Sequence, residues 1–276
     1  MRKNQVTLIT TLYNEVDNID RFLESYKNQT TYADEFIIVD GGSTDGTIEI
    51  IEKFANDNKE LNINLLIDKT CCKKFVVGPI AKGRNVAIEH AKYNYIAATD
   101  AGCVLDSKWF EEIVKPFKDT SVDVVSGWYE ALITNNFQKE YAEVAMPRLE
   151  KLDRENFLPS SRSIAFKKEC WKKVGGYPTR TYTAEDTKFD LDLKKAGYMF
   201  VFTEEAFVHW ECPKSLEEAK RKHFSYGFGN GQLRLFFGIF FIRGVMSLVK
   251  NKKNTIKYEI LKSDLAGYIR GLLHVV

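Results

Sequence analysis

Two stretches, VTLITTLYNEVDNIDRFLES (6–25) and EFIIVDGGSTDGT (35–47), decide the fold class. Each begins with a short run of β-branched and aliphatic residues and then becomes polar, and the first continues with apolar residues at helical spacing. The same alternation continues to residue 117, with strands expected at 6–11, 36–39, 63–67 and 95–99 and helices from about 14 and at 47–58, 81–91 and 107–117. This alternation predicts an α/β fold in which helices flank both faces of a mainly parallel sheet.

The pattern is less regular after residue 117. Strands are expected at 122–126 and 163–166, and helices at 137–151 and 185–195. This part favours a mixed or antiparallel edge of the sheet. Since no internal repeat or Pro/Gly/Ser linker is present, we expect one domain over residues 1–231 and a basic, helical C-terminal tail over 232–276.

Composition sets wide bounds on function. The 276 residues are 44% hydrophobic and 28% charged, as in a folded chain, and a net charge of +2 gives no reason to expect a nucleic-acid partner. Five cysteines without a CxxC pair favour a reducing, cytoplasmic compartment. Polar residues interrupt the apolar run after the charged N-terminus and no cleavage site follows, so we expect a strand there and no signal peptide.

The tail begins with an apolar run at 235–242 that is too short to span a bilayer. On a helical wheel, Gln232, Arg243, Ser247 and Lys250 share one side. Such an apolar face beside basic residues is typical of helices on anionic membranes, so we expect peripheral attachment at the inner face of the cell membrane. A helix packed on the preceding domain and a homo-oligomer contact are the alternatives. The basic residues are Arg243, Lys250, Lys252, Lys253, Lys257 and Lys262.

Polar residues gather after three predicted strands, in the loops that begin at Thr10, Asp40 and Asp100. Ligands of open α/β sheets bind outside the carboxyl ends of the strands. Asp, Gly and Ser also form ordinary loops, but three such loops at successive strand ends favour a nucleotide site. Neither GxGxxG nor GxxxxGK[ST] occurs, which excludes a dinucleotide fold and a P-loop. We therefore expect a phosphate-bearing ligand held by side chains, with a cation such as Lys82 or Arg84.

The stretches 6–25 and 35–47 quoted above are followed by GRNVAIEHAKYNYIAATDAGC (83–103) and AEDTKFDLDLKKAGY (184–198). In these stretches the chain resembles family 2 glycosyltransferases, and the resemblance covers residues 5–230. The resemblance implies the GT-A fold and transfer of a hexose with inversion from a nucleotide-sugar, commonly a UDP-sugar. The acceptor would be a hydroxyl of a glycan or of a lipid-linked saccharide. The implied donor contacts are Thr10, Tyr13, Asn14, Glu15, Asp40, Gly41, Ser43, Lys82, Arg84, Asn85 and Asp100.

By the same resemblance, Asp100 heads the DxD motif, but Asp100-Ala101-Gly102 lacks its second Asp. Mn²⁺ or Mg²⁺ prefers oxygen ligands and accepts water, so Asp100 and diphosphate oxygens would hold the ion. His209 is a candidate nitrogen ligand, and a histidine in the core or on the surface is an equally weighted alternative.

The proton acceptor is expected at the start of the helix 185–195. Attack by a hydroxyl requires a group that removes its proton. Glu185-Asp186 matches the ED pair of the family, whose Asp is the proposed base, so we assign Asp186 as the base and Glu185 as its partner. A carboxylate that only stabilises the helix N-terminus is the alternative. The metal ion, with Arg84 or Lys82, would disperse the charge of the leaving diphosphate.

The acceptor side is expected around Trp128 and Tyr129, whose aromatic faces suit sugar rings, although packing explains Trp128 equally well. Ser160-Ser161-Arg162-Ser163 fits either a phosphate contact or the start of a strand. HFSYGFGNGQ (223–232) fits either a mobile lid or a plain connection.

The lost second Asp motivates an alternative function, a catalytically silent protein that binds a nucleotide-sugar or a partner at the membrane. The presence of Asp100 and Glu185-Asp186 favours the enzyme. A nucleotidyltransferase is a third alternative, but TTLYNE (10–15) does not supply the glycine-rich basic loop that such enzymes carry after the first strand.

Overall fold

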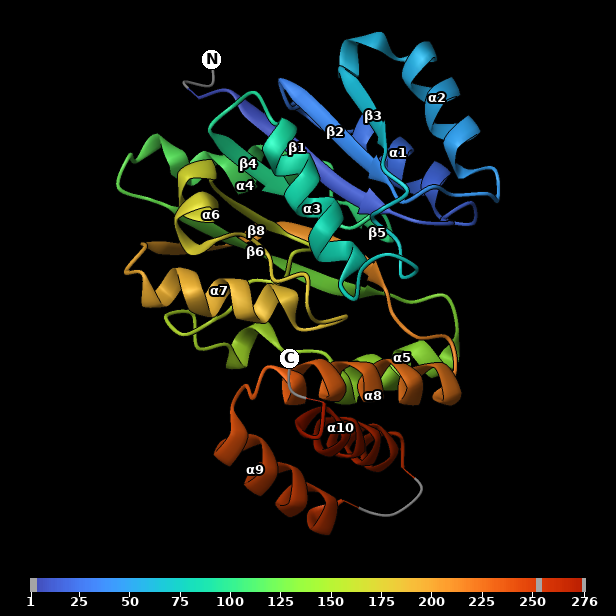
Figure 1. Ribbon diagram of the computed structural model, residues 1–276, viewed down its shortest axis with the longest axis vertical. Coiled ribbons are helices and arrows are strands. Elements are labelled where there is room, and N and C mark those ends of the chain that lie inside the picture. Colours follow the sequence, from blue (N-terminus) through green and yellow to red (C-terminus); the bar gives the residue numbers. More distant parts are fainter. Residues whose placement is uncertain (1–3, 252–254, 275–276) are drawn as a thin grey trace.

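The computed structural model describes residues 4–251 and 255–274, and an eight-stranded sheet forms its centre (Figure 1). The order of the strands across the sheet is β3-β2-β1-β4-β7-β6-β8-β5. The strands are β1 Val6–Leu12, β2 Glu35–Asp40, β3 Ile63–Ile67, β4 Tyr95–Ala98, β5 Cys103–Leu105, β6 Val124–Leu132, β7 Ile164–Lys167 and β8 Phe200–Glu211.

The first half of the sheet is parallel and the second half is mixed. Strand β1 pairs in parallel with β2 and β4, and β2 pairs in parallel with β3. Strand β7 runs antiparallel to both β4 and β6, β6 is parallel to β8, and β5 is antiparallel to β8. The predicted mainly parallel α/β sheet with a mixed edge is confirmed. The carboxyl ends of β1, β2 and β4 consequently lie at one edge.

Helices cover both faces of this sheet, and three of them form the end of the molecule opposite α2 (Figure 1). The α-helices are α1 Ile19–Lys27, α2 Thr47–Asp57, α3 Pro79–His90, α4 Trp109–Val114, α5 Asn136–Ala145, α6 Lys168–Val174, α7 Glu185–Lys195, α8 Leu216–Gln232, α9 Phe237–Lys250 and α10 Ile256–Leu272. Short 3-10 turns are η1 Lys59–Leu61, η2 Lys115–Lys118 and η3 Leu149–Lys151.

Two apolar cores lie on opposite faces of the sheet because successive strand residues point to opposite sides. Leu8 of β1 packs in the core that contains Phe22 of α1 and Trp109 of α4. Its neighbour Ile9 belongs to the other core, together with Phe189 of α7. Burial on both faces explains why the parallel strands read as continuous apolar runs.

Two expected helices are shorter than the sequence pattern suggested, and proline is the reason in both. The helix expected over 137–151 ends at Ala145, and Pro147 separates it from η3. The helix expected over 107–117 ends at Val114 and continues as η2, which contains Pro116. Proline lacks the N–H that a helix interior needs and restricts the residue before it. The three-residue strand β5 was not predicted.

The expectation of a lid or plain connection at 223–232 is wrong, because these residues form the second half of α8. The side chain of Ser215 caps the helix by accepting a hydrogen bond from the Glu218 N–H. Gln232 ends α8, and Arg234 and Phe236 then adopt positive φ before α9 begins. Gln232 and Lys250 therefore lie on different helices, so the helical wheel drawn through both was also wrong.

Glycines allow α8 and α10 to pack with their backbones in contact. A Cβ placed on Gly227 would lie only 1.9 Å from the carbonyl oxygen of Asp264. Helix α10 thus packs against the preceding domain, as one alternative for the tail anticipated. The glycines at this crossing are Gly227, Gly231, Gly267 and Gly271.

The basic tail is described only in part. Lys252, Lys253 and the side chain of Arg243 lie outside the described residues. Within 4–251 and 255–274, no helix has both the length and the apolar composition that crossing a bilayer requires.

The α8–α10 crossing predicts the effect of one added methyl group. Gly227→Ala should lower the free energy of unfolding by about 1–3 kcal/mol, because the helices must move apart. Gly238→Ala in α9 is the matched control, since a Cβ there meets nothing within 4 Å. Urea denaturation of both variants checks this, and equal stability of the two would contradict the close crossing.

Candidate active site

Buried polar atoms without partners mark the carboxyl edge of the parallel strands. Asp40, at the end of β2, is fully buried, and its Oδ1 accepts hydrogen bonds from the N–H groups of Gly42 (2.7 Å) and Ser43 (2.6 Å). Its Oδ2 and the hydroxyls of Thr10 and Thr99 have no partner among the described residues. Leaving such atoms unpaired costs about 1–3 kcal/mol each. A ligand that pairs with them would recover this cost.

The loop after β1 is fixed against the loop after β2. The N–H of Asn14 donates to the Ser43 hydroxyl (2.7 Å), and its side-chain oxygen accepts from the Thr44 N–H (2.9 Å). Tyr13 is about half exposed and lies over Gly41, where a Cβ would come within 3.3 Å of the tyrosine ring. The predicted donor residues of β1 and β2 therefore share one surface.

Glu15 lies close enough to Asp100 for the two charges to interact. Burial raises the pKa of Glu15, and the charge of Asp100 adds to the effect. Lys82 of α3 lies beside Asp68, whose N–H donates to the carbonyl of Asp40. Its charge helps a hydrogen bond from Thr70 to lower the pKa of the Asp68 carboxyl.

Asn85 serves the framework. Its side-chain oxygen accepts from the indole N–H of Trp171 and the N–H of Tyr177, both at 2.9 Å, and its amide donates to the Tyr177 carbonyl (2.8 Å). These bonds fix the turn after α6. These hydrogen bonds account for an asparagine at position 85, and no nucleotide contact is needed to explain it.

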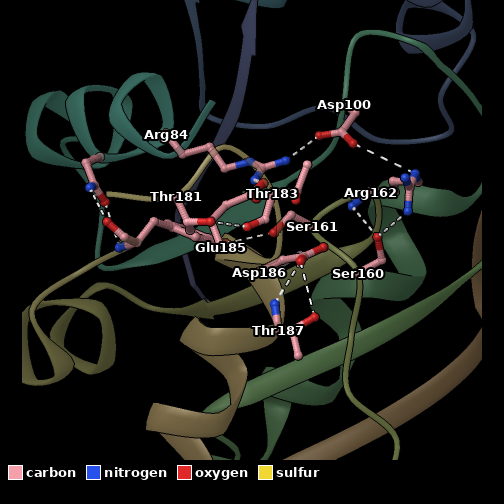
Figure 2. Close-up of polar contacts among 12 residues, drawn as sticks. Arg84, Asp100, Ser160, Ser161, Arg162, Thr181, Thr183, Glu185, Asp186 and Thr187 are labelled. Carbon is pink, nitrogen blue, oxygen red and sulfur yellow. Dashed lines mark hydrogen bonds and ion pairs between the residues drawn. The ribbon is translucent and has the colours of Figure 1, made fainter. Parts of the chain in front are cut away.

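Arg84 joins the two carboxylate motifs of the sequence (Figure 2). Its guanidinium is 4% exposed, with Nη2 2.6 Å from Asp100 Oδ1 and Nη1 2.8 Å from Glu185 Oε1. Burial disfavours the charge of Asp100, but Arg84 and then Arg162 outweigh it and lower the pKa of that carboxyl. Burial and the adjacent charge of Asp186 raise the pKa of Glu185, against the attraction of Arg84.

Asp186 is the accessible member of the Glu185-Asp186 pair. It is half-buried, its Oδ1 accepts the N–H of Thr187 at 2.7 Å, and it forms no ion pair with any described residue. Glu185 is only 7% exposed and is bound to Arg84. The geometry therefore leaves Asp186 free to meet a substrate.

Helix α8 supports the turn that precedes Asp186. The Thr183 hydroxyl donates to the Ser225 carbonyl of α8 (2.5 Å), and a Cβ on Gly229 would lie 2.3 Å from that hydroxyl. Ala184 adopts φ 65°, a left-handed conformation that an alanine rarely takes. The packed helix holds this strained residue directly before α7.

A second cationic group lies beyond Asp100, and sequence reasoning missed one of its two members, Lys222. The sequence left Arg162 open as a phosphate contact or the start of a strand. In the structure its guanidinium carbon lies 5.2 Å from the centre of the Tyr129 ring and 4.3 Å from that of Trp210. Its Nε is 3.9 Å from Asp100 Oδ2. Lys222 of α8 lies 4.3 Å from the centre of the same Trp210 ring. Burial, and then the charge of Arg162, lower the pKa of Lys222 to about 8. No sequence pattern connects residues this far apart.

The two predicted acceptor residues differ in surroundings. Trp128 is 4% exposed and packs on Phe157 and Phe202, which supports its packing alternative. Tyr129 points to the opposite side of β6 and stacks beneath Arg162. Only Tyr129 thus lies at the site.

The residues around Asp100 do not fit a divalent cation. Both of its carboxylate oxygens face guanidinium groups, and His209 projects from the face of β8 opposite to Trp210, which contacts Arg162. Within the described part of the chain, no group of three or more His, Cys, Asp or Glu residues is placed to hold a metal. The structure therefore does not bring the predicted pair, Asp100 and His209, together.

Comparisons with known proteins identify several similar chains. Glycosyltransferase AglE of Haloferax volcanii is 24% identical over 233 residues, which cover 83% of this chain and 73% of that protein. The mannosyltransferase PcManGT of Pyrobaculum calidifontis, solved with GDP-Man and Mn²⁺, has a TM-score of 0.64 and 21% identity and covers 99% of this chain and 74% of its own. S. aureus TarS 1–349, solved with UDP, has a TM-score of 0.59 and 18% identity, with coverages of 98% and 86%.

The structural likeness to these glycosyltransferases confirms the predicted GT-A fold. The family model described as Glycosyl transferase family 2 matches residues 7–173. As this match spans more than half of the sequence, the chain belongs to glycosyl transferase family 2.

Proposed function

We propose that this chain is an active, inverting glycosyltransferase that moves a sugar from a nucleotide-sugar to an acceptor hydroxyl. The observation that carries the proposal is the position of Asp186. It is the unpaired carboxylate beside Glu185, which Arg84 ties to Asp100 at the edge where the orphaned atoms of Thr10 and Asp40 lie. A protein that only bound the donor would need no such carboxylate.

The donor is a nucleoside diphosphate sugar in this proposal. Asp40 Oδ2 suits an N–H of the base or a ribose hydroxyl, and the Thr10 hydroxyl offers a second contact. PcManGT and TarS were solved with GDP-Man and with UDP. The resemblance to the family makes a UDP-sugar the first candidate. The donor residues remain those predicted around β1, β2 and Asp100.

Asp186 takes the proton of the acceptor hydroxyl as its oxygen forms a bond to the anomeric carbon. The bond from that carbon to the diphosphate breaks on the opposite side, and its electron pair stays on the diphosphate. Tyr129 lines the acceptor side, where a glycan or a lipid-linked saccharide would bind. No step uses a divalent cation, because Asp100 is already paired with Arg84.

Replacing the base separates chemistry from binding. Asp186→Asn should lower the transfer rate by about 10² to 10⁴-fold, because the amide cannot accept the proton. Donor affinity should change little. Asp192→Asn is the control, since Asp192 pairs with Lys188 on the same helix. Transfer assays and calorimetric titration with the donor measure both effects.

Retention of most of the turnover by Asp186→Asn would remove Asp186 as the base. Donor binding without turnover by the unaltered protein, across a panel of acceptors, would favour the catalytically silent alternative.

We further propose that α9 lies on an anionic membrane surface, with residues 1–231 as the catalytic domain and 232–276 as the tail that places it at the inner face. Ile242, Met246 and Val249 are exposed and lie on one side of α9, since their spacing is four and three residues. Phe237 is exposed at the start of the helix, and Lys250 is exposed at its end. Apolar side chains beside a basic residue suit the headgroup region.

Vesicle flotation tests this surface. The triple variant Ile242→Ser, Met246→Ser, Val249→Ser should float markedly less with vesicles that contain anionic lipid, because it loses the buried apolar area. A triple variant at exposed apolar positions elsewhere, Ile133→Ser, Val144→Ser, Met199→Ser, is the control. Equal flotation of both variants and the unaltered chain would remove the membrane proposal.

A further inference from the structure

We propose that Arg162 and Lys222 form the binding subsite for the donor's diphosphate and supply the positive charge that a divalent cation supplies in metal-dependent transferases. The inference rests on the proposed function. It concerns Arg162, which the sequence left open as a phosphate contact, and Lys222, which no sequence motif identified.

Arg162 keeps its charge available. Its Nη1 donates to the Ser160 hydroxyl (2.8 Å), whereas its Nε is buried and has no hydrogen-bond partner among the described residues. The nearest carboxylate oxygen is Asp100 Oδ2, at 3.9 Å from Nε, while Arg84 holds Oδ1 at 2.6 Å. The adjacent rings of Tyr129 and Trp210 hold the guanidinium without neutralising it.

Lys222 carries the second charge. Figure 2 shows Arg162 beyond Asp100 as seen from Arg84, and Lys222 shares the Trp210 ring with Arg162. In the part of the chain that the structure describes, the ammonium group makes no hydrogen bond or ion pair. Two half-buried cations near one ring repel each other, and an anion that contacts both offsets the repulsion.

The balance of charge favours this anion. Arg84 offers one positive charge to two carboxylates, Asp100 and Glu185, so these groups together with Arg162 and Lys222 carry one net positive charge. The excess lies beside Asp100, where the family motif expects the metal ion. When the bond to the anomeric carbon breaks, the electron pair left on the diphosphate adds negative charge next to these two cations. Placed cations stabilise that charge more in a partly buried site than in water.

Calorimetric titration of the full chain tests the subsite. The probes are UDP and GDP, with uridine and guanosine as the matched ligands without phosphate. The unaltered chain should bind one of the diphosphates equally, within about twofold, in Mn²⁺ and in EDTA. Lys222→Met should weaken the binding of that diphosphate about tenfold or more, because a charge-assisted contact is lost, and should leave the affinity for the nucleoside unchanged.

Lys222→Arg should restore most of the affinity for the diphosphate. Lys220→Met is the matched control, because Lys220 lies two residues away and pairs with Glu217, and it should leave this affinity unchanged. Arg162→Met should repeat the loss if its thermal unfolding shows a folded chain, and Lys222→Met keeps the test valid if it does not. Loss of diphosphate binding in EDTA, or unchanged affinity in Lys222→Met, would overturn the inference alone. Failure of the unaltered chain to bind any of the four probes would overturn the proposed function as well.

Discussion

A single buried guanidinium organises the site. Arg84 comes from α3, Asp100 from the turn after β4, and Glu185 from the first residue of α7, and the three meet only because the sheet brings these segments to one edge. A buried charge without its partner costs several kcal/mol, so each segment is held to the other two. The position of Asp186 relative to the donor edge follows from this constraint.

The C-terminal helices act on the same segment from the other side. Helix α8 contacts the turn before α7 through Thr183, and its last residue, Gln232, accepts a hydrogen bond from Thr181 and donates one to the His274 carbonyl. The glycine crossing locks α10 onto α8. The tail thus contacts the segment that precedes Asp186, the proposed base, so a membrane surface that engages α9 would act close to α7.

The sequence predicted the parallel half of the sheet well because its strands are buried on both faces and its helices are amphipathic. It failed where short-range pattern carries no information. Strand β5 has only three residues, and the glycines of α8 suggest flexibility when read alone. In the structure, Gly227 is required by the backbone of α10, a contact between segments distant in the chain.

The residues of the candidate site were also predicted only in part. Asp100, Glu185 and Asp186 were predictable from motifs, but the role of Arg84 as their link was not. Arg162 and Lys222 meet at Trp210 because β7, β6 and β8 are neighbours in an order that periodicity cannot show. For His209 the sequence offered a metal ligand without showing which way its side chain points, and alternation along β8 places the ring on the face opposite to Trp210.

The link through Arg84 is tested most directly by a double-mutant cycle of Arg84→Met and Glu185→Gln, read as the free energy of unfolding in urea. The account predicts that Arg84→Met alone destabilises the chain by about 3–5 kcal/mol, since it leaves the buried Glu185 carboxylate unpaired, and that the two changes couple by about 1 kcal/mol or more. Arg154→Met, at an exposed ion pair with Glu204, should cost less than about 1 kcal/mol. Additive effects, or a cost for Arg84→Met no larger than for Arg154→Met, would contradict the central role of Arg84.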